Sequence, residues 1–198
     1  WSVKVLVEHI VDLGHSKVKL RSDGEKSIKA LLAQVSAELK RKGVTVVPDQ
    51  TPEGDSQAGG VQEAAVKTVK DKTRCIWLQF CEMHGLKADA GNHRHQLLPW
   101  AVRYAGQLHT RTVKGADGRT GWQRHKGGWR DFPRKAIRWG EKVQYVQGGA
   151  KMKPQLEGKF ATEGIFLGYI ERTEEYIIGT PEGCVKTKDI HRMRPDEA

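Results

Sequence analysis

Two acidic residues in the first third of the chain have the types and setting of a metal site. Asp23 follows a short alternating stretch, and Glu63 comes 40 positions later, in the first turn of an expected helix. Two carboxylates that converge on one point can hold Mg²⁺ or Mn²⁺, hard cations that prefer oxygen ligands. Such ions can activate an attacking hydroxyl and stabilise a leaving oxygen in phosphodiester chemistry. Spacing alone favours the simpler interpretation, in which both carboxylates are solvated surface groups. The neighbouring residues are therefore needed to distinguish a metal site from two surface groups.

Apolar periodicity predicts the elements that would position these two acids. Stripes at helical spacing alternate with short β-branched or alternating segments, and Gly14 and Gly43 follow two of the stripes as stop signals. The turn-rich stretch 48–60 predicts a loop between the acids. The predicted helices are 2–13, 26–42, 61–83, 95–113 and 119–126, and the predicted strands are 17–21 and 44–47.

From Gly140 onward the pattern changes to short strands separated by glycines and charged turns. Candidate strands include Val143 with Tyr145, 165–167, 176–178 and 184–185, and Thr180-Pro181-Glu182-Gly183 is a hairpin signal. Four or five strands in such a short segment indicate a small SH3-like barrel. The expected fold class is therefore α/β, followed by a small all-β barrel.

The positive charge of the chain is concentrated in one third of its length. Lys and Arg number 34 against 24 Asp and Glu, and 15 of the basic but only 4 of the acidic residues lie between Lys87 and Lys153. Such segregation is typical of a protein that binds a polyanion, most often nucleic acid. Tryptophans and phenylalanines interleave with these cations, which suits phosphate contacts combined with base stacking. The alternative is a basic linker whose tryptophans pack on the flanking domains.

Several other classes are excluded by composition. No apolar run approaches the length of a membrane span, and the start of the chain does not resemble a secretory signal. Cys75, Cys81 and Cys184 form no paired zinc pattern, although Cys81 and His84 could share a helix face. We therefore expect a reduced intracellular protein without a membrane anchor. Because the chain opens in mid-pattern without Met, we expect it to be a fragment.

Residue motifs around the two acids resemble those of a known family. Val18-Lys19-Leu20-Arg21-Ser22-Asp23 and Ala58-Gly59-Gly60-Val61-Gln62-Glu63 resemble the second and third acidic motifs of the retroviral-type integrase core, in its copia-type retrotransposon branch. Further stretches are similar to the SH3-like domain that follows copia-type cores. These stretches are Gly140-Glu141-Lys142-Val143, Gly164-Ile165-Phe166-Leu167-Gly168-Tyr169, Gly179-Thr180-Pro181-Glu182-Gly183 and Lys188-Asp189-Ile190.

The resemblance implies an RNase H-like fold in which three acidic residues bind two Mg²⁺ or Mn²⁺ ions. The family processes DNA 3′ ends and joins them to target DNA, which implies DNA integration as the function. Asp23 would be the second catalytic and metal-binding acid, and Glu63 the third. The implied partners are the element ends and target DNA, together with further copies of the protein in a homo-oligomer. The implied location is the nucleus, with no membrane contact.

Cations near the third acid and in the basic segment are the expected DNA contacts. Lys67 and Lys70 lie one and two turns beyond Glu63, where the resemblance implies that DNA phosphates pass, and Arg74 continues their stripe. The other predicted DNA-binding residues are Arg124, Lys126, Arg130, Arg134, Lys135 and Arg138.

The same resemblance predicts three parts. Residues 1–127 would be a partial RNase H-like core, 128–139 a basic Trp-rich linker, and 140–198 the SH3-like β-barrel. Two alternatives to an integrase fragment remain open. One is a non-enzymatic nucleic-acid- or chromatin-binding module derived from an integrase, and the other is a binder of single-stranded RNA.

The first acid of the family is expected to lie outside this chain. Only 22 residues precede Asp23, too few for the strands and helix that normally come first, and Asp12 falls inside the first predicted helix. Whether the chain is itself an enzyme is therefore uncertain, and we expect it to be inactive as given.

We predict that the chain alone carries out neither 3′-end processing nor strand transfer in Mg²⁺ or Mn²⁺. Two carboxylates can hold one ion weakly, whereas two-metal chemistry needs both ions anchored with open positions for the phosphate and the nucleophile. Joined to an upstream segment that supplies the first acid, the protein should transfer labelled DNA ends. In that longer protein Glu63→Gln should abolish transfer, since it removes the anionic charge. Transfer by the chain alone, or transfer that survives Glu63→Gln, would place the active site elsewhere.

Overall fold

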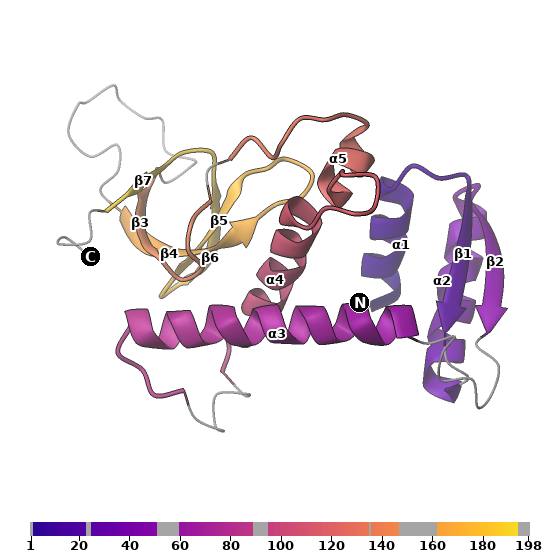
Figure 1. Ribbon diagram of the computed structural model, residues 1–198, viewed down its shortest axis with the longest axis horizontal. Coiled ribbons are helices and arrows are strands. Elements are labelled where there is room, and N and C mark those ends of the chain that lie inside the picture. Colours follow the sequence, from indigo (N-terminus) through magenta and orange to yellow (C-terminus); the bar gives the residue numbers. More distant parts are fainter. Residues whose placement is uncertain are drawn as a thin grey trace. The chain divides into compact units, whose positions relative to one another are not determined.

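Two compact units make up the chain, Trp1–Val66 and Lys67–Ala198. The structure, a computed structural model, describes residues 2–22, 25–50, 60–88, 95–134, 136–146 and 162–193 (Figure 1). The expected boundaries of core, linker and barrel stay a prediction.

The first unit is a small α/β arrangement. Its elements are α1 (Ser2–Asp12), β1 (Lys17–Ser22), α2 (Lys26–Arg41) and β2 (Thr45–Gln50). β1 and β2 pair in parallel, with Lys17 opposite Thr45. A parallel pair needs a long crossover, which α2 provides. Val7, Val35, Leu39 and Val44 form the buried core of this unit.

A glycine C-cap ends α2 and directs the chain into β2. The Val44 amide donates to Leu39 O (3.0 Å) and the Gly43 amide to Lys40 O (3.1 Å). These two bonds make a Schellman motif, which needs a left-handed residue, and Gly43 has φ of 78°. The stop signal expected at Gly43 is therefore confirmed.

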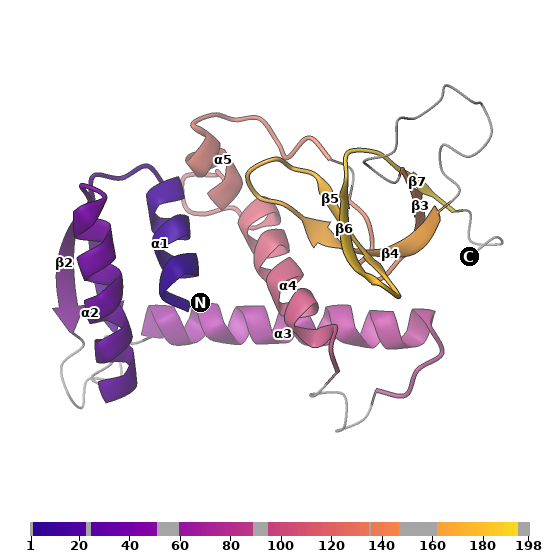
Figure 2. The same cartoon turned by 180° about the vertical axis from the view of Figure 1, so that it is seen from behind.

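The second unit combines helices with a five-stranded antiparallel sheet (Figure 2). Its first helix is α3 (Gly60–Met83), which starts in the first unit, and α4 (Leu98–Thr112) and α5 (Gly121–Lys126) follow. The strands are β3 (Lys142–Tyr145), β4 (Thr162–Tyr169), β5 (Tyr176–Thr180), β6 (Gly183–Thr187) and β7 (Ile190–Arg192), in the order β6-β5-β4-β3-β7.

The short connection between β6 and β7 forces this sheet to curl. β6 and β7 are its two edges, and four strand spacings would separate them by about 19 Å if the sheet were flat. From Thr187 to Ile190 the chain can reach at most about 11 Å. The buried Thr187 hydroxyl accordingly lies within hydrogen-bond distance of both Asp189 O (3.0 Å) and Val146 O, just beyond β3 (3.2 Å). The edges of the sheet therefore approach each other, whereas full closure into a barrel stays a prediction.

An aromatic core joins the sheet to the helices of the second unit. Trp139, just before β3, is 1% exposed and lies with its ring centroid 5.0 Å from that of Phe80 on α3. Phe166 of β4 is fully buried and makes an edge contact with Tyr104 of α4 at 5.5 Å. Phe80 and Trp139, 59 positions apart, and Tyr104 and Phe166, 62 positions apart, thus share one core.

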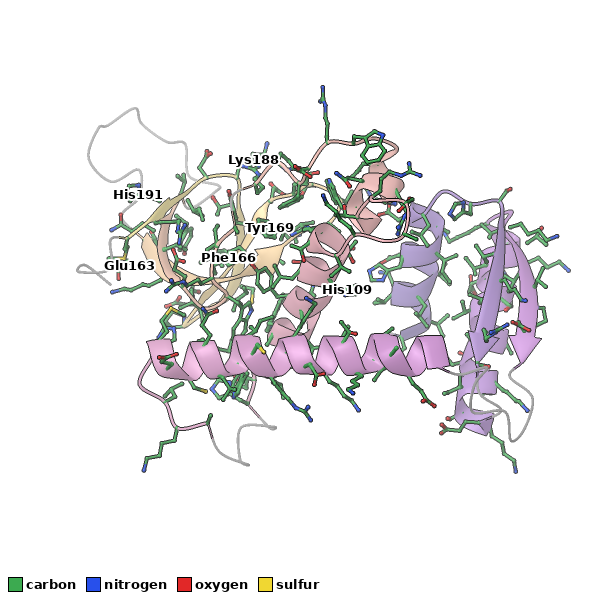
Figure 3. The ribbon with its side chains drawn as sticks, viewed as in Figure 1. His109, Glu163, Phe166, Tyr169, Lys188 and His191 are labelled. Atoms are coloured by element: carbon green, nitrogen blue, oxygen red, sulfur yellow. The ribbon has the colours of Figure 1, made fainter. Side chains whose placement is uncertain are left out.

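One glutamine fixes α4 to a bulge in β4. Gln107 Nε2 donates to Tyr169 O (2.7 Å), and the Tyr169 amide donates to Gln107 Oε1 (3.2 Å), all buried. The β4–β5 register shifts between Phe166 and Gly168, and Gly168 has φ of 138°. A Cβ at Gly168 would lie 3.0 Å from Gln107 Oε1, so a glycine is needed here for both its backbone angle and its lack of a side chain. Figure 3 labels Phe166 and Tyr169 on β4.

The mixed α/β class expected from the sequence is confirmed, and the strands expected after Gly140 form an antiparallel sheet. The helix expected over 95–113 starts at Leu98, because the His95 ring accepts the Leu97 amide (3.2 Å) and Pro99 occupies the first turn. Residues 48–50 of the expected loop extend β2, and 51–59 lie outside the described residues. None of the described helices combines the length and apolar character needed to cross a membrane.

Gln107→Met should destabilise the second unit by about 2–4 kcal/mol. The substitution keeps the side chain's length but removes both buried hydrogen bonds that Gln107 makes to the Tyr169 backbone, each at a cost of about 1–3 kcal/mol. Urea unfolding followed by tryptophan fluorescence measures the change. Gln79→Met, at an exposed position of α3, is the matched control and should change stability by less than about 0.5 kcal/mol.

Candidate nucleic-acid interface

Of the two predicted catalytic acids, the structure describes one. Glu63 lies in the first turn of α3 and is exposed, as the sequence predicts, while Asp23 lies outside the described residues. A single exposed carboxylate is a weak ligand, and the described parts of the chain contain no group of three or more His, Cys, Asp or Glu that could hold a metal ion. The pairing of Asp23 with Glu63 and the binding of Mg²⁺ or Mn²⁺ therefore stay predictions.

The predicted cations of α3 are exposed along the helix. Lys67, Lys70 and Arg74 all face solvent, and Arg74 pairs with Asp71 at 3.0 Å. An exposed pair of this kind is worth little in water, so the Arg74 guanidinium can exchange Asp71 for a phosphate at small cost.

A second set of predicted cations surrounds α5, whose start is tightly capped. The Gln123 amide donates to Thr120 Oγ1 (3.1 Å), and the Thr120 amide donates to Gln123 Oε1 (2.8 Å). This capping box lets a helix of only six residues persist. Both views place α5 at the far end of α4 from α3 (Figures 1 and 2). The α3 and α5 cations therefore form two separate sets.

Ion pairing occupies Arg124, one of the predicted DNA contacts. Its guanidinium binds the Asp117 carboxylate through two hydrogen bonds, of 2.6 and 3.0 Å, and Arg119 binds the same carboxylate at 3.0 Å. The hydrogen bond from Arg124 holds the pKa of Asp117 well below its usual range, with further help from Arg119. Asp117 is thus ionised throughout the physiological range and offsets part of the local positive charge.

Arg134, another predicted contact, is used by the fold. Its guanidinium lies 5.0 Å over the Tyr176 ring and donates to Lys188 O (3.4 Å), between β6 and β7. Lys135 lies outside the described residues. Lys126, Arg130 and Arg138 are exposed, and the Lys126 ammonium lies 4.9 Å from the centre of the Trp122 ring. We refer to these three residues as the α5–linker cations.

The sequence did not identify Arg111 of α4, a cation that contacts several aromatic rings around the basic segment. Its guanidinium lies 3.7 Å from the centre of the Phe132 ring and 4.5 Å from that of Tyr169. Burial lowers the pKa of Arg111, yet the aromatic faces compensate for lost water through cation–π contact. Its position three residues beyond Leu108, on the apolar stripe of the helix, was the available signal.

The tryptophans of the basic segment divide into buried and exposed. Trp122 and Trp139 are 8% and 1% exposed, so packing rather than stacking on DNA accounts for their rings. Trp129 is 69% exposed. The linker backbone is itself anchored, because the Tyr104 hydroxyl donates to Ile137 O at 2.7 Å.

Comparison with known proteins gives distant matches among solved structures only. No protein-family model matches the chain, and no curated protein matches it. Among solved structures, it is similar to a chain of the cryo-EM structure of the simian T-cell lymphotropic virus intasome in complex with PP2A regulatory subunit B56 gamma. That match has a TM-score of 0.38 and 12% identity, and covers 98% of this chain and 64% of that chain.

Tyr104 should make the stability of the second unit sensitive to alkaline pH. Burial raises the pKa of Tyr104 to about 12, so its protonated form is favoured in the folded state. This contribution is complete below pH ~10, the unfolded value, and is lost as pH rises toward 12. Tyr104→Phe should cost about 1 kcal/mol at neutral pH and reduce the decline in stability between pH 10 and 12. Urea unfolding at a series of pH values tests this, and parallel curves for the two proteins would contradict it.

Proposed function

We propose that the chain is the DNA-binding part of a copia-type retrotransposon integrase. The observation that carries the proposal is the basic segment, which is held on a folded scaffold rather than on a free linker. Lys126 is the last residue of the capped helix α5, and Arg138 precedes the buried Trp139. Cations at fixed positions lose little conformational freedom on meeting phosphates, which favours binding.

The topology of the sheet supports the SH3-like part of the proposal. Four strands in a meander, with the fifth returning to pair with the first, give the order β6-β5-β4-β3-β7. The curl imposed by the β6–β7 connection is what a small barrel requires. In the first unit, the parallel pair β1 and β2 with its α2 crossover is consistent with a part of an RNase H-like sheet.

DNA binding by this chain is proposed to have little sequence preference. Specific readout places a helix or a strand ribbon in the major groove, and α5 has only six residues. Its exposed cations instead offer phosphate contacts, which position a duplex without reading its bases.

In the intact protein, catalysis is proposed to involve Asp23 and Glu63 as ligands of Mg²⁺ or Mn²⁺. Such ions would supply the Lewis acid and the activated hydroxyl for 3′-end processing and strand transfer. The two carboxylates would hold the metal ions near the start of α3. Lys67 and Lys70 follow one and two turns further along this helix. The proposal also implies a homo-oligomer and a nuclear location, where target DNA is found.

A non-enzymatic DNA- or chromatin-binding module is the second candidate. The observation in its favour is that the α5–linker cations belong wholly to the second unit, whereas Asp23 and Glu63 belong to the first. Binding therefore does not depend on the acidic residues. Catalysis by a longer form of the protein distinguishes the two candidates.

Salt titration tests the binding proposal directly. With about 4–6 phosphates neutralised, the logarithm of affinity for duplex DNA should fall with the logarithm of salt at a slope of about −4 to −5. Replacing Lys126, Arg130 and Arg138 together by Gln should reduce the magnitude of this slope by about 2–3, since each phosphate contact contributes about 0.9 to it. Arg134 is left intact because the fold uses its side chain.

The matched control replaces the same number of exposed lysines on α2. Lys26, Lys29 and Lys40 changed to Gln should leave the slope unaltered, although the net charge falls equally. Equal slopes for all three proteins, or no measurable binding at low salt, would contradict the proposal.

A further inference from the structure

Among the tryptophans that the structure describes, Trp129 has an unusually exposed side chain. It is 69% exposed, whereas Trp77, Trp122 and Trp139 are each exposed by 8% or less. A tryptophan normally buries most of its large ring, so an indole left in water needs an explanation.

The segment that carries Trp129 is held firmly. Gln123, only 5% exposed, donates from Nε2 to Trp129 O (3.0 Å) and to Asp131 Oδ1 (3.1 Å). The Gly128 amide donates to Gln123 O (3.0 Å), and Gly127 ends α5 in a left-handed conformation. The capping box and the loop thus share one buried residue, Gln123, which binds the backbone at Gly128 and Trp129 and the side chain of Asp131.

Positive charge surrounds the ring. The Arg119 guanidinium lies over it, 5.7 Å from its centre, and the exposed Arg130 is its neighbour in sequence. Between Asp117 and Arg138 the sequence has seven Lys or Arg residues and two acidic residues, Asp117 and Asp131, so a positive excess remains although Asp117 pairs with Arg119 and Arg124. This charge favours a polyanionic ligand over an apolar protein surface.

We propose that Trp129 is a stacking platform for an unpaired base of the DNA bound by the α5–linker cations. The inference rests on the proposed function. Bases inside a duplex are stacked on both faces, so an exposed indole can reach only a base in a single-stranded tail or gap. Arg119 covers one side of the indole, and the base occupies the other, while the neighbouring cations bind the phosphates.

Fluorescence anisotropy of the full chain with three labelled DNAs tests this proposal. The probes are a blunt duplex, the same duplex with a short thymidine tail, and that duplex with a tail of abasic sugars. Wild type should bind the thymidine tail more tightly than the other two, because the abasic tail keeps the phosphates but has no bases to stack.

Trp129→Ala should weaken binding to the tailed duplex by about 5- to 150-fold, the effect of one stacked base, and change binding to the blunt duplex by less than about 2-fold. The salt slope should stay the same, since stacking releases no counterions. Trp129→Phe is the matched control and should keep most of the preference. Thermal unfolding should show that both variants are folded as wild type, because the Trp129 side chain is exposed and Gln123 binds its backbone.

Each remaining result has a definite meaning. Equal affinity for thymidine and abasic tails, or an equal effect of Trp129→Ala on blunt and tailed DNA, overturns the stacking proposal and leaves duplex binding intact. Failure of wild type to bind any of the three DNAs at low salt overturns the proposed function, and the stacking proposal with it.

Discussion

The docking of α4 onto the bulged strand β4 is the constraint on which the second unit depends. Just beyond the bulge, the Gln107 side chain hydrogen-bonds both the amide and the carbonyl of Tyr169, and Arg103 also donates to that carbonyl at 3.5 Å. Arg111, one turn further along α4, stacks on the ring of the same tyrosine. The sheet is therefore attached to the helix through backbone and ring together, and Gly168 leaves the space for it.

This docking also determines where the basic residues lie. Phe132 is stacked against Arg111, and Ile137 accepts the Tyr104 hydroxyl, so α4 binds the linker at two points. A segment that looks like a flexible connector in sequence is thus part of the folded unit. Fixed attachment explains how an aromatic ring such as that of Trp129 can remain in solvent without collapsing onto the core.

Local sequence patterns predicted the elements well and the tertiary contacts poorly. Periodicity was enough for the helices, for the Gly43 cap and for the β5–β6 hairpin, because each depends on neighbours in sequence. The roles of Gln107 and Arg111 depend on partners far along the chain, and even the position of Arg111 on the apolar stripe of α4 does not identify those partners. Charge counting likewise treated Arg124 and Arg134 as free cations, although an ion pair and a ring hold them. Glu63 lies where the sequence put it, and its partnership with Asp23 stays a prediction.

The strand order has a consequence for synthesis on the ribosome. Tyr145 of β3 pairs with Ile190 of β7, which is translated 45 residues later. At ordinary elongation rates that interval lasts about 2–9 s, during which this side of β3 has no partner strand. An unpaired strand edge is a template for pairing with other chains, and charged side chains discourage it. Lys142 and Gln144 give β3 a charged and a polar side chain during that interval.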